Sequence, residues 1–405
     1  MWSDRGEGAV SYVAVILLLG GVMGAVLTGG VGEKVAAACE SAICRVAGGD
    51  CRTMGLGEHG KGGARQGVAD HDGGKAQVRP LVSVPQQDLP PISRPACPDP
   101  KVPWVDTLHA HNDYQNGDPL DDALEEGATS VEADVWLEDG KLILKHDKDD
   151  LNLPNATLLQ EYLRPLTERA AKNGGQIYPG RGEKFELFIE VKGGGGDAYE
   201  QIVKDIAGPP PLTGDVRVVL PVPPNYDPAT NKVGNTSLPA NVSFSVGLGD
   251  KCVIPTWLDP KDPANDPRSP EYRPDEQHYD QRLASKVTVL NGEFAKCVDV
   301  DKKRKLNISP QEHRVFNELV GRAHSQGRKV RIWGAPDGNW RYAGSRGRGK
   351  FYPCPTLPGH QKCEGALQRN WWQAVDEAGA DYYVTDHLGT GAKWIRKNCG
   401  RFVKR

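Results

Sequence analysis

Short apolar runs alternate with amphipathic stretches from about residue 101 onward. Residues 119–127, 310–327 and 365–380 have the apolar spacing of helices. Eight runs are rich in β-branched and aromatic residues, as strands are; they are 105–110, 129–135, 185–191, 216–222, 242–247, 287–290, 329–333 and 381–385. Because strands that alternate with helices pair in parallel through right-handed crossovers, the pattern predicts an α/β fold, a (β/α)8 TIM barrel.

A doubly wound open sheet is the alternative arrangement of the same elements. That fold needs a glycine-rich phosphate turn after its first strand, and the sequence has none there. The glycine run at 192–196 lacks the Gly-Lys-Ser/Thr of a P-loop, so we expect a flexible loop over the barrel mouth. Residues 223–285 are rich in Pro and Asp, which predicts a long loop elaboration that shapes substrate choice.

The N-terminal part of the chain has a different pattern. Residues 9–31 are apolar and carry no charge, which is long enough for a transmembrane helix; a cleaved signal peptide is the rival reading. Gly, His, Gln and Pro without periodicity predict a linker over 52–100. We therefore expect a membrane leader over 1–51 and a barrel over 101–405, with the barrel outside a single-pass anchor or secreted.

Charge and cysteine content narrow the classes of function. A formal net charge of −3 gives no electrostatic case for a nucleic-acid partner. No cysteines form a C-x-x-C pair, which argues against a zinc ribbon or a thioredoxin motif. Cysteines spread along the barrel predict disulfides in an oxidising compartment, with scattered buried thiols as the alternative; they are Cys97, Cys252, Cys297, Cys354, Cys363 and Cys399, of which Cys354 and Cys363 are the most local candidate pair.

Acidic side chains stand where a barrel places its functional groups, at the carboxyl ends of strands. Residues two apart on a strand share a face, so Glu132 and Asp134 point the same way, as do Glu190 and Lys192. Three carboxylates that converge would repel one another, and a hard divalent cation relieves that repulsion. The sequence therefore predicts that Glu132, Asp134 and Glu190 bind Mg²⁺ or Ca²⁺, which prefer oxygen ligands.

Histidines accompany these carboxylates. His109 and His111 share a face at the end of the first strand, and His146 follows a short hairpin. Two imidazoles beside a hard cation indicate proton transfer to and from a phosphodiester. Which of His109 and His111 takes part stays open at this point. Trp333 and Asp386 end the last two strands, where both could line the pocket, Trp333 as an apolar wall.

The stretches "HND", "VEADVWLEDGKLILKHD" and "LFIEVK" resemble the PLC-like phosphodiesterases, the superfamily that holds the glycerophosphodiester phosphodiesterases, and above all its branch with "HAHNDY". The resemblance spans roughly residues 104–392. It implies catalytic roles for His111 and His146, metal binding by Glu132, Asp134 and Glu190, and a phosphate contact by Lys192.

One position departs from the family's pattern. Asn112 and Asp113 replace its usual Arg-Gly, so an arginine that would touch the phosphate is missing. We count His109, Asn112 and Trp333 with Lys192 as candidate substrate-binding residues.

Residues 1–51 in turn resemble the N-terminal helix of Flp-type pilin-like proteins. We expect a metal-dependent phosphoric diester hydrolase of lipid metabolism, acting on a glycerophosphodiester or phospholipid-type substrate and tethered to the membrane by its N-terminal helix. The alternatives are an exported toxin or effector phosphodiesterase, and a catalytically inactive barrel that serves as a surface binding module.

Overall fold

The computed structural model describes residues 97–150, 156–212, 214–298, 308–335 and 360–402. All eight predicted strands are present in one sheet, and neighbouring strands pair in parallel in the order β11-β10-β9-β5-β4-β2-β1-β12. Among the described residues no ladder joins β11 to β12, so the barrel is nearly closed. The strands are β1 Val105–Ala110, β2 Ala128–Glu138, β4 Phe185–Gly193, β5 Val216–Pro221, β9 Val242–Gly247, β10 Val287–Glu293, β11 Lys329–Trp333 and β12 Tyr383–Thr385.

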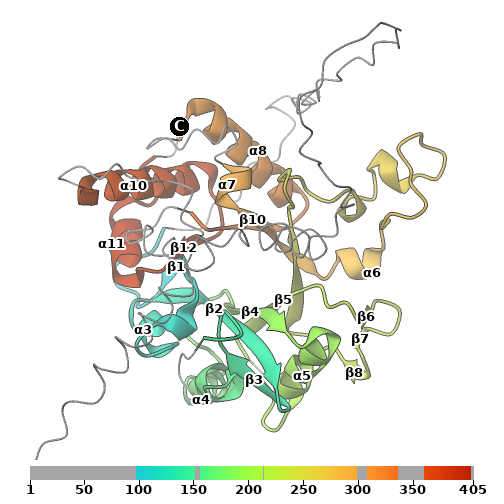
Figure 1. The fold of residues 1–405 in the computed structure, drawn as a ribbon. Coiled ribbons are helices and arrows are strands. Elements are labelled where there is room, and N and C mark those ends of the chain that lie inside the picture. Colours follow the sequence, from blue (N-terminus) through green and yellow to red (C-terminus); the bar gives the residue numbers. More distant parts are fainter. Residues whose placement is uncertain (1–96, 151–155, 213, 299–307, 336–359, 403–405) are drawn as a thin grey trace, which may run out of the picture. The chain divides into compact units, whose positions relative to one another are not determined.

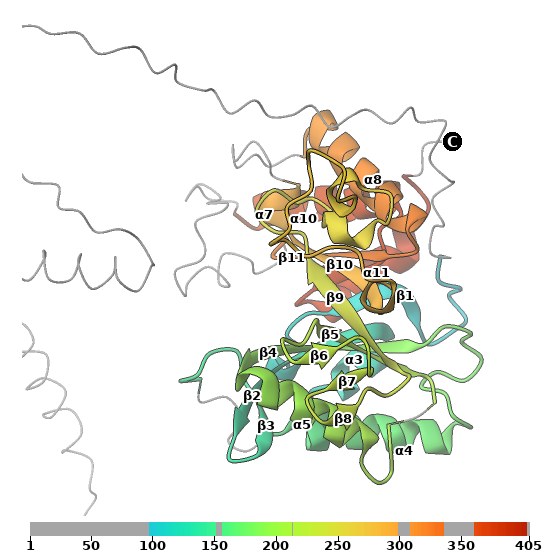
Figure 2. The ribbon, with the colours of Figure 1, turned by 90° about the vertical axis from the view of Figure 1, so that its right-hand side faces the viewer.

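Helices follow most of the strands. Helices α4 and α5 lie on one side of the strands and α8 and α10 on the opposite side (Figures 1 and 2). The α-helices are α3 Asp121–Glu125, α4 Arg164–Lys172, α5 Gly195–Ala207, α6 Gln281–Ala284, α7 Phe294–Cys297, α8 Pro310–Ser325, α10 His360–Ala378 and α11 Leu388–Asn398. Shorter helical turns are η1 Asp113–Gln115, η2 Leu159–Leu163, η3 Thr256–Leu258 and η4 Pro263–Asn265.

Local sequence explains where these elements begin. In α8, the Ser309 hydroxyl accepts the Glu312 amide, and the Glu312 carboxylate accepts the Ser309 amide, which is a complete capping box with Pro310 after it. Strand β2 is buried on both faces over 128–135. Its Val131, with Ala133 and Val135, belongs to the main core with helix residues, whereas the alternating Ser130, Glu132 and Asp134 face the barrel interior.

A small apolar layer crosses the barrel interior; it consists of Phe188, Val219, Val289, Tyr382 and Val384. On one side of it lie the carboxyl ends of the strands, here called the C-terminal mouth. On the other side lies a cavity of about 630 Å³, whose lining includes Glu186, Lys329 and Arg181. The two ends of the barrel are therefore two separate polar environments.

The connection from β5 to β10 departs from a regular barrel. The predicted loop elaboration over 223–285 contains strand β9 and a small antiparallel sheet, in which β7 (Lys232–Val233) lies between β6 (Tyr226–Asp227) and β8 (Thr236–Ser237). No α-helix separates β5 from β9. The predicted loop at 192–196 is wrong in part, because β4 runs to Gly193 and α5 begins at Gly195.

Four of the six cysteines that were predicted to form disulfides do so. Cys97 pairs with Cys399 and Cys252 with Cys297, whereas Cys354 and the side chain of Cys363 lie outside the described residues. The apolar segment 9–31 and the pilin-like region 1–51 also lie outside them. Within the residues that are described, no helix combines the length and apolarity needed to cross a bilayer.

Candidate active site at the C-terminal mouth

Three predicted ligands converge at the mouth. The parallel register pairs Asp134 of β2 with Glu190 of β4, and Glu132 lies two residues before Asp134 on the same face. One oxygen from each of the three lies within 4.8 Å of the others. We call Glu132, Asp134 and Glu190 the three-carboxylate site.

Among the described residues, each of these carboxylates makes its hydrogen bonds and ion pairs through one of its two oxygens. Asp134 accepts the Tyr114 hydroxyl at 2.9 Å through Oδ2, while its buried Oδ1 has no hydrogen-bond partner among the described residues. Glu190 meets Lys192 Nζ through Oε1 at 3.1 Å. Glu132 makes its contacts through Oε2. Three oxygens remain for a cation, and an all-oxygen donor set of this kind fits Mg²⁺ or Ca²⁺.

Burial and like charge act on the acidity of this group. Burial and the neighbouring Glu132 carboxylate raise the pKa of Asp134 to about 7, against the opposing effect of Lys192. Burial acts most strongly on Glu132 and would raise its pKa, but Arg331, His111, Lys192 and the Asn112 amide together outweigh burial and lower the pKa. Lys192 Nζ lies 3.3 Å from Asp134 Oδ2 and 3.1 Å from Glu190 Oε1. Burial would lower the pKa of Lys192, but these two carboxylates outweigh burial and raise it. Lys192 therefore contacts two of the predicted ligands directly.

His111 lies at the edge of the three-carboxylate site. Its Nδ1 is 2.7 Å from Asp386 Oδ1, and its Nε2 is 3.6 Å from Glu132 Oε2. Burial opposes the charged ring, yet Asp386 and Glu132 outweigh that effect and raise the pKa of His111 to about 9. Asp386 fixes the ring so that Nε2 faces the carboxylates, the orientation that an acid/base group needs.

His109 has a different environment from His111. It is fully buried, with Nδ1 2.8 Å from the Ser130 hydroxyl and Nε2 3.1 Å from Arg331 Nε, and its ring lies edge-on to Phe188 and Tyr382. Burial and the Arg331 charge hold its pKa well below the usual value. The ring lies inside the barrel, below the three-carboxylate site.

Arg331 is the residue of this site that sequence reasoning missed. It is 2% exposed and its Nη2 lies 2.6 Å from Glu132 Oε2. One signal was available: in "KVRIW" the arginine alternates with Val330 and Ile332, so it had to point into the barrel. Its partner Glu132 is 199 positions earlier, and no local pattern joins the two.

The loop after β1 is held by Asp113. This buried carboxylate accepts the Leu120 amide, the Tyr162 hydroxyl and the Asn116 amide group. The adjacent Asn112 has a left-handed backbone with φ of 47°, and its N–H lies 3.4 Å from Glu132 Oε2. Asp113 is thus part of the scaffold, while Asn112 lies beside His111 and Glu132.

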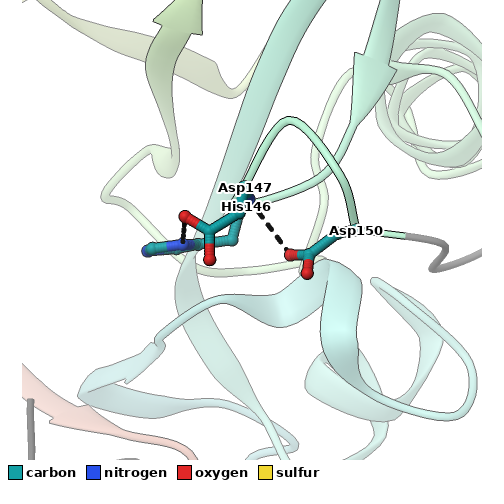
Figure 3. Close-up of side chains that lie close together, drawn as sticks. All are labelled: His146, Asp147 and Asp150. Carbon is teal, nitrogen blue, oxygen red and sulfur yellow. Dashed lines mark hydrogen bonds and ion pairs between the residues drawn. The ribbon is translucent and has the colours of Figure 1, made fainter. Parts of the chain in front are cut away.

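His146 belongs to a neighbouring group with Asp147 and Asp150 (Figure 3). Its Nδ1 is 3.1 Å from Asp147 Oδ1, and the Asp147 amide donates to Asp150 Oδ2 at 3.0 Å. The predicted hairpin before it is confirmed, since β3 (Lys141–Leu144) pairs antiparallel with β2. The Lys145 amide donates to the Asp134 carbonyl at 3.2 Å, which places the His146 backbone beside the three-carboxylate site.

Trp333 ends β11, two residues beyond Arg331, and its side chain is 38% exposed. No contact of the Trp333 ring with the three-carboxylate site is found in the described part of the chain. The structure therefore brings together Glu132, Asp134, Glu190, Lys192, His111 and Asn112. His146 follows Lys145, whose backbone is hydrogen-bonded to that of Asp134, and His109 lies inside the barrel in contact with Arg331.

Comparison with known proteins connects part of this chain to a phosphodiesterase-like domain. Residues 102–207 match the family model described as the AIM6-like phosphodiesterase domain. This segment runs from the start of β1 to the end of α5 and contains the three-carboxylate site, His111, His146 and Lys192. Over this part of the barrel the chain thus carries the sequence features of an AIM6-like phosphodiesterase domain.

Curated relatives share the name "Altered inheritance of mitochondria protein 6". The one from Lachancea thermotolerans is 26% identical over 311 residues, which are 70% of this chain and 64% of that protein. The one from Kluyveromyces lactis is 37% identical over 107 residues, 26% of this chain and 25% of that protein. The matches therefore span less than two thirds of the length of these relatives.

Solved structures of a calcium-dependent phosphoinositol-specific phospholipase C from a Pseudomonas species also align with the chain. One crystal form has a TM-score of 0.36 and 10% identity, covering 75% of this chain and 94% of that one. The form described with myoinositol has a TM-score of 0.34 and 10% identity, covering 71% and 90%.

Proposed function

We propose that this protein is a metal-dependent phosphoric diester hydrolase. One observation carries the proposal: the three-carboxylate site lies beside His111, whose ring is oriented by Asp386. Within the described part of the chain, one oxygen of buried Asp134 has no hydrogen-bond partner. The match of residues 102–207, which include the three carboxylates and His111, to a phosphodiesterase-like domain supports the proposal. We propose a glycerophosphodiester or a phospholipid-type molecule as the substrate class.

Glu132, Asp134 and Glu190 would hold the cation, Mg²⁺ or Ca²⁺, which when bound neutralises charge on the non-bridging phosphate oxygens. The protein's own residues move the protons. One of His111 and His146 takes the proton of the attacking hydroxyl, from water or from the substrate itself, as that oxygen bonds to phosphorus. The other donates a proton to the leaving oxygen as its bond to phosphorus breaks.

Full-length His111→Ala and Glu132→Ala variants test the proposal. Removing a general acid or base is expected to lower kcat by roughly 10²- to 10⁴-fold on a diester such as glycerophosphocholine or bis(p-nitrophenyl) phosphate. Chelation should abolish turnover, and Mg²⁺ or Ca²⁺ should restore it. His313→Ala is the matched control, because His313 also pairs with a carboxylate, Glu377, but lies on α8. Unchanged diester turnover in both variants would show the proposal to be wrong.

We propose an oxidising location for the barrel, attached to a membrane by residues 9–31 or secreted. The disulfides Cys97–Cys399 and Cys252–Cys297 support such a compartment. Fractionation of cells that express the full chain, with thiol labelling before and after reduction, tests this.

A further inference from the structure

Arg331 is at the centre of a buried chain of polar side chains. Each of its three nitrogens contacts a different residue: Nε lies 3.1 Å from His109 Nε2, Nη1 lies 3.1 Å from Asn291 Oδ1, and Nη2 lies 2.6 Å from Glu132 Oε2. Strand register supplies one of these neighbours, because Asn291 pairs with Arg331. It also pairs His109 with Ser130. The guanidinium therefore makes hydrogen bonds through Nε and Nη1, while Nη2 makes an ion pair without hydrogen-bond geometry.

The contact with Arg331 determines where His109 carries its proton. A guanidinium only donates hydrogen bonds, so His109 Nε2 must accept, with its lone pair free. The remaining proton of the neutral ring is then on Nδ1, which donates to the Ser130 hydroxyl at 2.8 Å. A ring held in this form by two partners has no nitrogen left for a substrate. His109 is therefore not the acid or base of the reaction.

The same guanidinium determines how Glu132 is used. Arg331, the Asn112 amide and His111 all approach Oε2, so in the part of the chain that is described the hydrogen bond and ion pairs of Glu132 leave Oε1 for a cation. A buried ion pair contributes little to stability that well-packed apolar residues would not. Stability alone therefore gives no reason for a buried arginine here, whereas orientation of a metal ligand does.

We propose that Arg331 is a positioning residue of the three-carboxylate site: it holds Glu132 by Oε2 so that Oε1 is presented to a cation, and His109, protonated on Nδ1, holds Arg331. The inference rests on the proposed function and assigns roles within it. Arg331 also places a positively charged side chain on β11 near the loop after β1, where Asn112 and Asp113 carry no positive charge.

Calorimetric titration of the full chain with Mg²⁺ or Ca²⁺ alone tests the role of Arg331. Arg331→Lys keeps the positive charge and loses the fork that joins His109, Asn291 and Glu132. Loss of such an outer partner is expected to weaken cation affinity by roughly 10- to 100-fold and to lower kcat/KM by a similar factor. Arg181→Lys is the matched control: Arg181 is also buried and paired, with Asp106, but it lines the cavity at the other end of the barrel. Its cation affinity should not change.

Nitrogen NMR of labelled His109 tests the other half of the proposal and needs no variant at this site. The expected spectrum at about neutral pH is that of a neutral ring protonated on Nδ1. A ring protonated on Nε2, or on both nitrogens, would overturn the proposal, as would wild-type cation affinity in a folded Arg331→Lys. Titration and NMR need no substrate. Should the wild-type chain turn over no diester while both give the expected results, the proposed function fails and the positioning role stands.

Discussion

The two carboxylate oxygens of Asp134 have different environments. Tyr114 and Lys192 contact one oxygen of Asp134, and the other is buried without a partner among the described residues. A carboxylate in that position is costly when ionised, which is why its pKa rises to about 7. The proton and a divalent cation therefore compete for Asp134.

This competition gives a pH dependence with a definite sign. Below pH 7 Asp134 is protonated in the cation-free protein, so a cation must displace the proton, and affinity is expected to fall roughly tenfold per pH unit as the solution is acidified. Calorimetry in two buffers of different ionisation enthalpy measures the proton released. Asp134→Asn has no proton to lose and should show no release from this position. Equal wild-type affinities at about pH 6 and pH 8 would contradict the expectation.

At the scale of elements, the packing of β4 against Trp136 of β2 determines the position of His146. A Cβ added to Gly193 would lie 2.2 Å from Trp136 Cε3, so the end of β4 approaches the indole too closely for any side chain. The indole Nε1 in turn donates to the His146 carbonyl at 3.2 Å. The position of His146 thus depends on a glycine in another strand.

Gly193→Ala is expected to displace Trp136 and, with it, His146. Overpacking of this kind costs about 1–3 kcal/mol of unfolding free energy, measurable by urea denaturation. Diester turnover should fall through kcat, while cation affinity at the three-carboxylate site stays close to that of the wild type. Gly247→Ala is the control, since a Cβ there meets nothing within 4 Å at the end of β9. If the two variants behave alike, Gly193 does not have this role.

At the scale of the whole molecule, two disulfides close loops of very different length. Cys97 and Cys399 are 302 positions apart, whereas Cys252 and Cys297 are 45 apart. In the chain-entropy model the longer loop constrains the unfolded chain more, by about 1–2 kcal/mol. The first disulfide joins the residues before β1 to the end of α11, and Arg396 of α11 joins the same two segments by donating to the Val102 carbonyl.

Paired Cys→Ser variants test this ordering. We expect Cys97→Ser with Cys399→Ser to lower the free energy of unfolding more than Cys252→Ser with Cys297→Ser, when both are measured by denaturant titration. Diester turnover at low temperature should persist in the first pair, because neither cysteine contacts the mouth. A larger loss from the shorter loop would show that native contacts, not chain entropy, dominate.

The sequence predicted the strands better than the site. Period-two patterns identify strands such as 129–135 because burial acts on each residue locally. The position of Glu132, Asp134 and Glu190 near strand ends was enough to predict that they converge, as they do. The choice between His109 and His111 could not be made from a shared face. It depends on Arg331, 222 positions from His109, and on Asp386, 275 positions from His111. Such pairs arise only when the barrel closes.

The Cys97–Cys399 bond also has a mechanical consequence. It makes the polypeptide from β1 to α11 a covalent ring. Force applied through the residues that precede Cys97 would pass across the sulfur bridge to the end of α11, and strand β1 would not be peeled from its neighbours β2 and β12. Because β1 leads directly to His111, tension on the chain would leave His111 in place for as long as the bridge stays oxidised.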